Sequence, residues 1–170
     1  MLSSGSEAKI RKAKPADAKA LAEVFRLSWQ QAYLGIIPHA HLESMIKRRG
    51  HEWWMGTIRS GDGLLVLEHA SRVAGYATFG AARVRGPYQG EIYELYLTPT
   101  YQGLGFGEHL FESCRHIFDE RRQRGLIVWA LAENSMATDF YWRRGGRPVA
   151  QTFDRIGGAK LEKIAFAWTT

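Results

Sequence analysis

The stretch Gln102-Gly103-Leu104-Gly105-Phe106-Gly107 restricts the fold more than any other part of the sequence. It follows a strand-like run, residues 91–97, and opens a run with helical periodicity, residues 105–124. Glycines at alternate positions let the backbone approach a ligand closely, and the first turn of a helix offers unpaired N–H groups with a partial positive charge. The stretch therefore predicts a pyrophosphate site at a strand-to-helix turn.

Two other phosphate-binding patterns do not fit this turn. A dinucleotide-binding turn, G-x-G-x-x-G, would need a glycine at position 108, where Glu108 stands, and a nucleoside-triphosphate loop would need Gly-Lys-Ser/Thr. No Ser, Thr, Asp or Asn occurs from Gln102 through Gly107 to cap the helix amides, so an external anion is the expected partner. The alternative is a glycine-rich turn that only connects two elements.

Strand and helix patterns extend from this turn in both directions. Further strands are expected over residues 9–14, 64–68, 73–81, 126–131, 147–153 and 161–168. Further helices are expected over residues 15–33, 39–47 and 134–144, with one more around Trp53 and Trp54. This order predicts a single mixed α/β domain over residues 1–170, with a central, mostly antiparallel sheet of about seven strands flanked by helices. Residues 1–7 are expected to form a flexible N-terminus.

The chain is basic, with 23 Lys and Arg against 17 Asp and Glu and a formal net charge of +6. Such an excess favours an anionic ligand, either nucleic acid or a multiply phosphorylated cofactor, although most of these side chains are expected on a solvated face. We do not predict nucleic-acid binding, because the aromatic residues fall mainly in apolar patterns. The basic clusters are Lys47-Arg48-Arg49, Arg121-Arg122-Gln123-Arg124 and Arg143-Arg144.

The sequence shows no sign of secretion, membrane insertion or metal binding. Residues 1–6 lack a basic region followed by an apolar stretch, and nowhere do 18 apolar residues follow one another, so a cytoplasmic protein is expected. The single cysteine, Cys114, agrees with a reducing compartment and is expected to be an inert core thiol rather than a nucleophile. Only His39 and His41 lie close together, and no second ligand pair follows, so no metal is predicted.

On these residues the chain resembles the GNAT superfamily of acetyl-CoA-dependent N-acetyltransferases. The family signature Gln/Arg-x-x-Gly-x-Gly/Ala matches residues 102–107 at every defined position. Glu94-Leu95-Tyr96-Leu97-x-Pro99 is similar to the family's fourth strand, and Asn134-x-x-Ala137-x-x-Phe140-Tyr141 is similar to its second cofactor motif. One departure is Gly145-Gly146, where the family usually has Gly-Phe, which puts local packing in question.

The resemblance implies the GNAT fold, acetyl-CoA as co-substrate, and an amine acceptor that is a small molecule or a protein. A homodimer is left open, and a non-catalytic acetyl-CoA-binding module is the alternative function. The cofactor residues implied are Tyr96, Leu97, Gln102, Gly103, Leu104, Gly105, Phe106, Gly107, Asn134 and Tyr141.

Roles follow for some of these residues. A backbone N–H near Tyr96 or Leu97 would polarise the thioester carbonyl. Tyr141 would give a proton to the departing thiolate, with a plain core tyrosine as the alternative. Asn134 suits a helix N-cap and, by the resemblance, would also bond the pantetheine arm.

An amine is mostly protonated at pH 7, so the transfer needs a base. Glu94 is the leading candidate, because on a strand it would share a face with Ile92 and Tyr96, and desolvation there would make the carboxylate harder to ionise. The alternatives are a carboxylate paired with a cross-strand arginine, Glu91 as the base, or a chain of water molecules.

The resemblance also implies that the loop after the first helix and the loop between the last two strands flank the acceptor. This points to Trp29, Tyr33 and the turn Gly35-Ile36-Ile37-Pro38. Because Trp29 shares a helix face with Leu21 and Phe25, a core position is the alternative for it, whereas Tyr33 at the helix end is expected at the mouth of the site.

Overall fold

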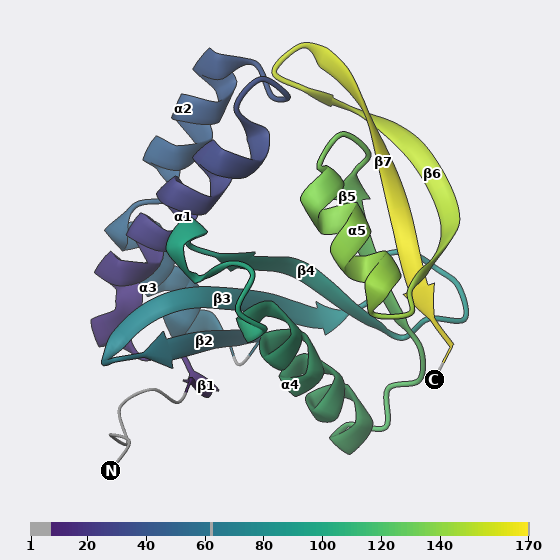
Figure 1. Ribbon diagram of the computed structural model, residues 1–170, viewed down its shortest axis with the longest axis horizontal. Helices are drawn as coiled ribbons and strands as arrows, with labels where there is room; N and C mark the ends of the chain where they lie inside the picture. The colour runs from purple at the N-terminus through teal and green to yellow at the C-terminus, as the bar shows by residue number, and fades with distance from the viewer. Residues whose placement is uncertain (1–7, 62, 170) are drawn as a thin grey trace.

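A seven-stranded sheet with the strand order β1-β2-β3-β4-β5-β7-β6 forms the centre of the molecule in a computed structural model, which describes residues 8–61 and 63–169 (Figure 1). The strands are β1 Lys9–Lys12, β2 Leu64–His69, β3 Arg72–Ala81, β4 Gly90–Leu97, β5 Leu126–Leu131, β6 Arg147–Ile156 and β7 Ala159–Trp168. The helices are α1 Ala18–Tyr33, α2 His39–Arg48, α3 His51–Ser60, α4 Phe106–Glu120 and α5 Ser135–Arg143, with 3-10 turns η1 Pro15–Asp17 and η2 Pro99–Tyr101. The predicted fold class is confirmed, and the prediction for residues 1–7 lies outside the described residues.

The sheet divides in two between β4 and β5. Strands β1 to β4 pair antiparallel in sequence order, and β5, β7 and β6 form a second antiparallel group. In the described part of the chain, β4 and β5 run parallel and pair only at Gly90 with Leu126 and at Glu91 with Ile127. Beyond these pairs the two groups diverge, as Figure 1 shows, and the edge of β4 that faces β5 is left without strand partners.

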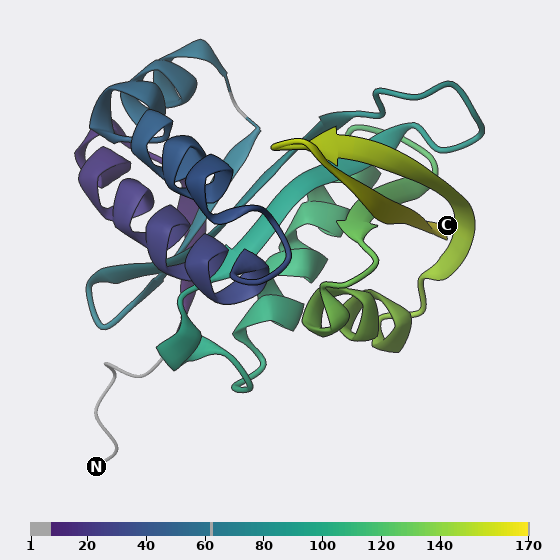
Figure 2. The same cartoon turned by 90° about the horizontal axis from the view of Figure 1, so that it is seen from above.

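Helices cover both faces of the sheet and bury two apolar clusters. On one face α4 packs its apolar stripe, Leu110, Phe111, Cys114 and Phe118, against β3 and β4. On the other face α1 buries Leu21, Phe25, Trp29 and Tyr33, which recur every fourth residue, against β3, β4 and α3. Figure 2 shows α1, α2 and α3 on one side of β2 to β4, with α4 and α5 on the other.

One predicted neighbour of Glu94 is wrong. Thr78 pairs with Glu94 and Phe79 pairs with Ile92, so Tyr93 is an extra residue that forms a β-bulge in β4. Because side chains alternate along a strand, this extra residue turns Ile92 to the α4 side of the sheet, while Tyr96 faces α1. Glu94 therefore shares its face with Tyr96 but not with Ile92.

The departure at Gly145-Gly146 has a packing reason. Gly145 has φ +93°, which a glycine adopts readily just after a helix. A Cβ on Gly146 would lie 2.5 Å from the ring of Trp168, whose indole N–H donates to the carbonyl oxygen of Arg144 at 3.0 Å. The second glycine thus makes room for a large residue at the end of β7.

Candidate active site

A cleft of about 480 Å³ lies between the open edge of β4, the end of α1, the start of α4, and α5. Of the ten residues predicted to bind the cofactor, all but Leu104 and Phe106 line this cleft. It also has Arg143 and Arg144 in its wall, so one of the basic clusters noted in the sequence lies at the predicted anion site. Arg144 pairs with Glu108 at 2.5 Å on the first turn of α4.

The glycine turn leaves its backbone exposed to the cleft. Gly103 has φ +77° and Gly105 has φ +82°, and a Cβ built on either would meet no atom within 4 Å. Gly105 is the N-cap of α4, and no side chain caps the helix there. Uncapped amides at a helix N-terminus, with open space in front of them, fit the pyrophosphate of coenzyme A.

The two residues of the turn that do not line the cleft have other positions. Leu104 is exposed, and Phe106 packs its ring against His69 and Tyr101. Phe106 thus anchors the turn to the core beneath it, and neither side chain belongs to the cleft wall.

The side chain of Gln102 connects three elements. Its Nε2 donates to the carbonyl oxygen of Leu97 at 3.1 Å and to Oε1 of Gln31 at 2.7 Å. Gln102 therefore fixes the turn to the end of β4 and to α1. Sequence reasoning missed Gln31, because its partner lies 71 residues away and no local pattern marks it.

Alternation along β4 indicates which amides face the gap. The N–H of Thr98 donates to Ala74 of β3 at 2.9 Å, so the N–H of Leu97 points to the opposite edge. That edge faces β5, with which β4 does not pair at this height in the described chain. Of the two predicted donors, Leu97 has its N–H toward the gap, whereas the N–H of Tyr96, two residues before Thr98, points toward β3 as that of Thr98 does.

Tyr96 of β4 and Tyr141 of α5 line the cleft, and Tyr33 of α1 lies behind Tyr96, outside the lining in the described chain. Tyr33 and Tyr96 share a hydrogen bond, and the side chain of Asn134 also interacts with the Tyr33 hydroxyl. Tyr141 is 5% exposed, and burial raises its pKa above the ordinary tyrosine value. Burial likewise raises the pKa of Tyr96, so these hydroxyls stay protonated at neutral pH and can donate hydrogen bonds.

Asn134 has the capping position expected of it. Its Oδ1 accepts a hydrogen bond from the N–H of Ala137 at 3.3 Å, at the N-terminus of α5. The residue also lines the cleft, so both interpretations of Asn134 agree with its place.

The two candidate carboxylates lie in different surroundings. Glu94 accepts hydrogen bonds from Nη1 and Nη2 of Arg49 at 3.1 and 3.0 Å, and from the hydroxyl of Tyr76 at 3.4 Å. The arginine comes from the junction of α2 and α3, and not from a neighbouring strand as the sequence alternative supposed. Glu91 is 1% exposed at the paired end of β4, where Arg83 binds both of its oxygens.

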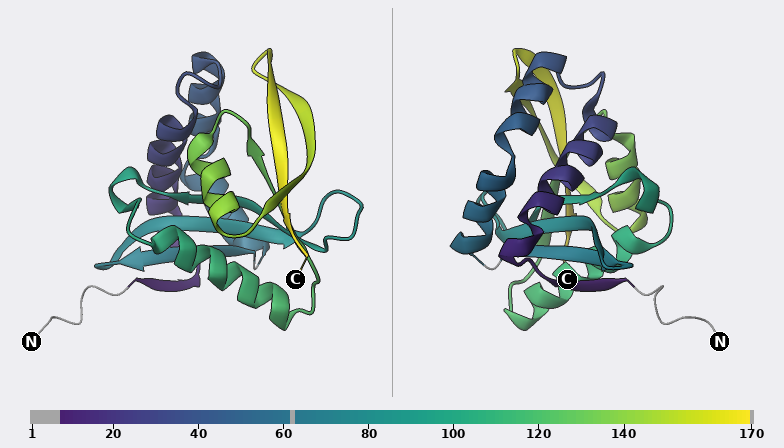
Figure 3. Two further views of the ribbon diagram at one scale, coloured as in Figure 1. Left: turned by 45° about the vertical axis from the view of Figure 1, so that its right-hand side comes forward. Right: turned by 90° about the vertical axis from the view of Figure 1, so that its left-hand side faces the viewer.

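The predicted acceptor elements meet at one end of the molecule. The tip of the β6–β7 hairpin reaches the start of α2, where a Cβ on Gly157 would lie 2.6 Å from His41 and 3.4 Å from Pro38 (Figure 3). Tyr33 is 6% exposed at the end of α1, beside these loops. Trp29 stacks on Phe25 at 4.5 Å between ring centroids and lies in the apolar cluster under α1.

Within residues 8–61 and 63–169, no helix has the length and apolar character needed to cross a membrane, and no group of three or more His, Cys, Asp or Glu is arranged to hold a metal ion.

Comparison with known proteins agrees with this geometry. Residues 21–145 match the acetyltransferase (GNAT) family. YuaI, an uncharacterized N-acetyltransferase of Bacillus subtilis (strain 168), is 29% identical over 161 residues, covering 94% of this chain and 91% of that protein. A spermidine N(1)-acetyltransferase of Thermoplasma acidophilum is 25% identical over 138 residues, covering 80% and 86%. The crystal structure of the PaiA N-acetyltransferase of Thermoplasma acidophilum, in complex with coenzyme A, has a TM-score of 0.76 at 22% identity and covers 96% and 99%.

The family match includes the glycine turn, the open edge of β4 and all of α5. The resemblance seen in the sequence, the GNAT fold and the enzyme class are confirmed together. This chain belongs to the acetyltransferase (GNAT) family and is an acyltransferase, which agrees with acetyl-CoA, the co-substrate expected from the sequence.

Proposed function

We propose that the protein transfers the acetyl group of acetyl-CoA to a primary amine by direct attack of the amine nitrogen on the thioester carbon. The observation that carries this proposal is the cleft between the open edge of β4 and the uncapped glycine turn of α4. One part of the cleft suits a pyrophosphate, and another is lined by Tyr96, Leu97 and Tyr141, with Glu94 outside the lining, two residues before Tyr96 on β4.

The cleft supports specific roles in binding. The amides from Gly103 to Gly107 would hold the pyrophosphate, and the guanidinium groups of Arg143 and Arg144 would add positive charge beside it. The pantetheine arm would run along the β4 edge toward Asn134. Cys114 is buried in the core, and burial raises the pKa of its thiol to about 12, so an acetylated cysteine has no support.

The reaction then needs a hydrogen-bond donor for the oxyanion, a base for the amine proton and a proton donor for the leaving thiolate. As the C–N bond forms, the thioester oxygen becomes negative and would accept the N–H of Leu97. Glu94, directly or through a water, would take the proton that the amine loses. The C–S bond breaks, and the thiolate would receive the hydroxyl proton of Tyr141.

An aliphatic amine is the acceptor class that we propose to test first. The rings of Tyr33 and Tyr96 and the carboxylate of Glu94 can hold a cationic alkyl chain. Similarity to a spermidine N(1)-acetyltransferase supports a polyamine within that class. Neither Glu94 nor Glu91 is among the described residues that line the cleft. Glu94 is favoured as the base, because it lies two residues before the cleft residue Tyr96 on the same face of β4, whereas Glu91 lies at the end of β4 that pairs with β5.

Initial rates of thiol release test the direct attack. We would vary acetyl-CoA at several fixed concentrations of spermidine, putrescine or a lysine-containing peptide. A direct attack needs both substrates bound at once and gives intersecting double-reciprocal lines. Parallel lines would indicate an acetyl-enzyme and refute the direct attack. Thiol release that no amine accelerates would indicate the alternative function, a non-catalytic cofactor-binding module.

A further inference from the structure

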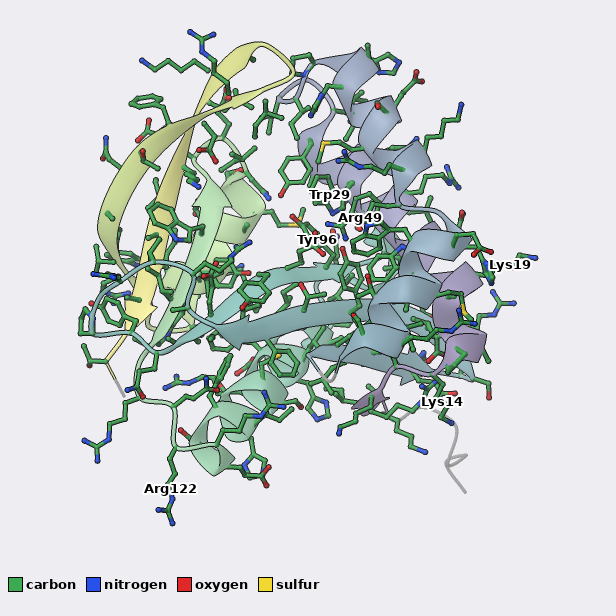
Figure 4. All side chains as sticks on the ribbon, turned by 180° about the vertical axis from the view of Figure 1, so that it is seen from behind. Lys14, Lys19, Trp29, Arg49, Tyr96 and Arg122 are labelled. Carbon is green, nitrogen blue, oxygen red and sulfur yellow. The ribbon has the colours of Figure 1, made fainter. Side chains whose placement is uncertain are left out.

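Arg49 is an inward-facing arginine in a protein whose basic side chains mostly point to solvent. It lies between α2 and α3, and its side chain is 19% exposed, against 13% for its partner Glu94. Figure 4 shows Arg49 beside Trp29 and Tyr96 in the interior, whereas Lys14, Lys19 and Arg122 extend outward. Such a buried arginine needs a reason beyond solubility.

Aromatic rings and the backbone hold Arg49 in one orientation. Its guanidinium carbon lies 3.8 Å from the centroid of Trp53 and 4.8 Å from that of Phe25. The indole N–H of Trp54 donates to the carbonyl oxygen of Arg49 at 3.1 Å. The rings of Trp53 and Phe25 thus hold the planar guanidinium, and Trp54 holds the backbone of Arg49. Little conformational freedom is therefore lost when Arg49 pairs with Glu94.

Arg49 and Tyr76 together fill most of the hydrogen-bonding capacity of Glu94. A carboxylate has about four acceptor positions. The two Nη groups of Arg49 take one on each oxygen, and the Tyr76 hydroxyl takes another on Oε1. Among the hydrogen bonds of the described chain this leaves one position, on Oε2, for an incoming proton.

Among the described groups around Glu94, Arg49 supplies the positive charge that contacts the carboxylate. Tyr76 from β3, Tyr96 from β4 and Tyr33 from α1 are neutral hydroxyls, because burial raises the pKa of each. Arg83 acts on Glu94 only at longer range and is bound by Glu91.

We propose that Arg49 is a positioning residue for the acetyl transfer: its two Nη groups hold the Glu94 carboxylate in one orientation, which leaves an acceptor position on Oε2 for the proton that the amine, or a water bound to it, gives up. This rests on the proposed role of Glu94 as the base. Arg49 is not among the described residues that line the cleft, so it would act through the carboxylate.

The test is a double-mutant cycle on kcat/KM for the acceptor, measured with the fastest amine of the panel, with KM for acetyl-CoA determined for each variant. Arg49→Met keeps an unbranched side chain beneath Trp53. Arg49→Lys keeps the charge but loses the bidentate pairing of the guanidinium with the carboxylate, and Glu94→Gln removes the base. A positioned general base contributes roughly 10²–10⁴-fold, so a carboxylate that has lost its fixed orientation should lower kcat/KM for the acceptor by at least about tenfold in Arg49→Met, with KM for acetyl-CoA nearly unchanged. Arg49→Lys should recover only part of the rate, because it keeps the charge but not the two paired Nη groups.

The Glu94→Gln background separates the outcomes. If Arg49 acts through Glu94, Arg49→Met should change kcat/KM by less than about threefold once Glu94 is Gln, since residues that act as a unit are not additive. An undiminished loss in that background, or an equal rise in KM for acetyl-CoA, overturns the proposal and leaves Arg49 a packing residue. Wild-type activity in Glu94→Gln alone would refute the base assignment instead. If Arg49→Met fails to fold, Arg49→Lys is the test, and a wild-type kcat/KM in Arg49→Lys overturns the proposal that the bidentate pair positions Glu94.

Discussion

Gly105→Ala separates the ligand-binding role of the glycine turn from its role in the backbone. Gly105 has φ +82°, and a Cβ there would meet no protein atom within 4 Å, so it would project into the space assigned to the pyrophosphate. Gly158, at the tip of the β6–β7 hairpin, has φ +84° and equally open surroundings. Gly158→Ala is therefore a matched control with the same backbone strain and no anion beside it.

The two effects have different sizes. Alanine in the left-handed region costs about 1–2 kcal/mol, which in a domain of this size lowers Tm by roughly 2–8 °C in both variants. Acetyl-CoA at 100 times its Kd stabilises the wild type by about 2.7 kcal/mol, or roughly 5–11 °C. If the added Cβ weakens binding a hundredfold, the same concentration leaves about 0.4 kcal/mol, or roughly 1–2 °C.

Thermal unfolding with and without acetyl-CoA measures both effects at once. Gly158→Ala should keep the full ligand-induced rise in Tm, and Gly105→Ala should lose most of it. An equal rise in the two folded variants would refute the assignment of the phosphate site to this turn.

Three further predictions follow from the site and the core. Tyr141→Phe should keep the rise in Tm with acetyl-CoA but lower kcat by roughly 10²-fold, because a proton donor is lost; an unchanged kcat, with chemistry rate-limiting, would make Tyr141 a core residue only. Tyr33→Ala should raise KM for the amine and leave KM for acetyl-CoA nearly unchanged, whereas equal changes would indicate a packing defect. Burial raises the pKa of the Cys114 thiol to about 12 from an unfolded value of about 8.5, so the unfolded state loses this proton first and the free energy of unfolding should fall above about pH 9. Urea titrations at pH 8 to 10 should show a steeper fall in the wild type than in Cys114→Ala, and equal slopes would contradict it.

Much of the fold could be predicted because its signals are local. The glycine turn, the stripe of α4 and the alternation of β3 and β4 each depend on residues close in sequence, and the elements occur where those patterns predict them. The eight lining residues named in advance also come together in one cleft, since a strand-to-helix turn brings β4 and α4 to the same place.

What the sequence could not provide depends on pairing between distant segments. The bulge at Tyr93 arises from the register between β3 and β4, and a one-residue shift moved Ile92 to the opposite face. Arg49 lies 45 residues before Glu94 in an ordinary basic cluster, and its inward direction follows from the packing of α3 on α1. The Gln31 to Gln102 bond likewise needed the tertiary structure.

Amine-dependent release of coenzyme A tests the central claim most directly. The purified protein is incubated with acetyl-CoA and each amine of the panel, the free thiol is titrated, and the acetylated amine is identified by mass spectrometry. At least one primary amine should yield thiol and N-acetyl product in equal amounts, with no more than slow hydrolysis when the amine is left out. Thiol release without any acetylated amine, or none with any amine while acetyl-CoA still raises Tm, would contradict acetyl transfer to a primary amine.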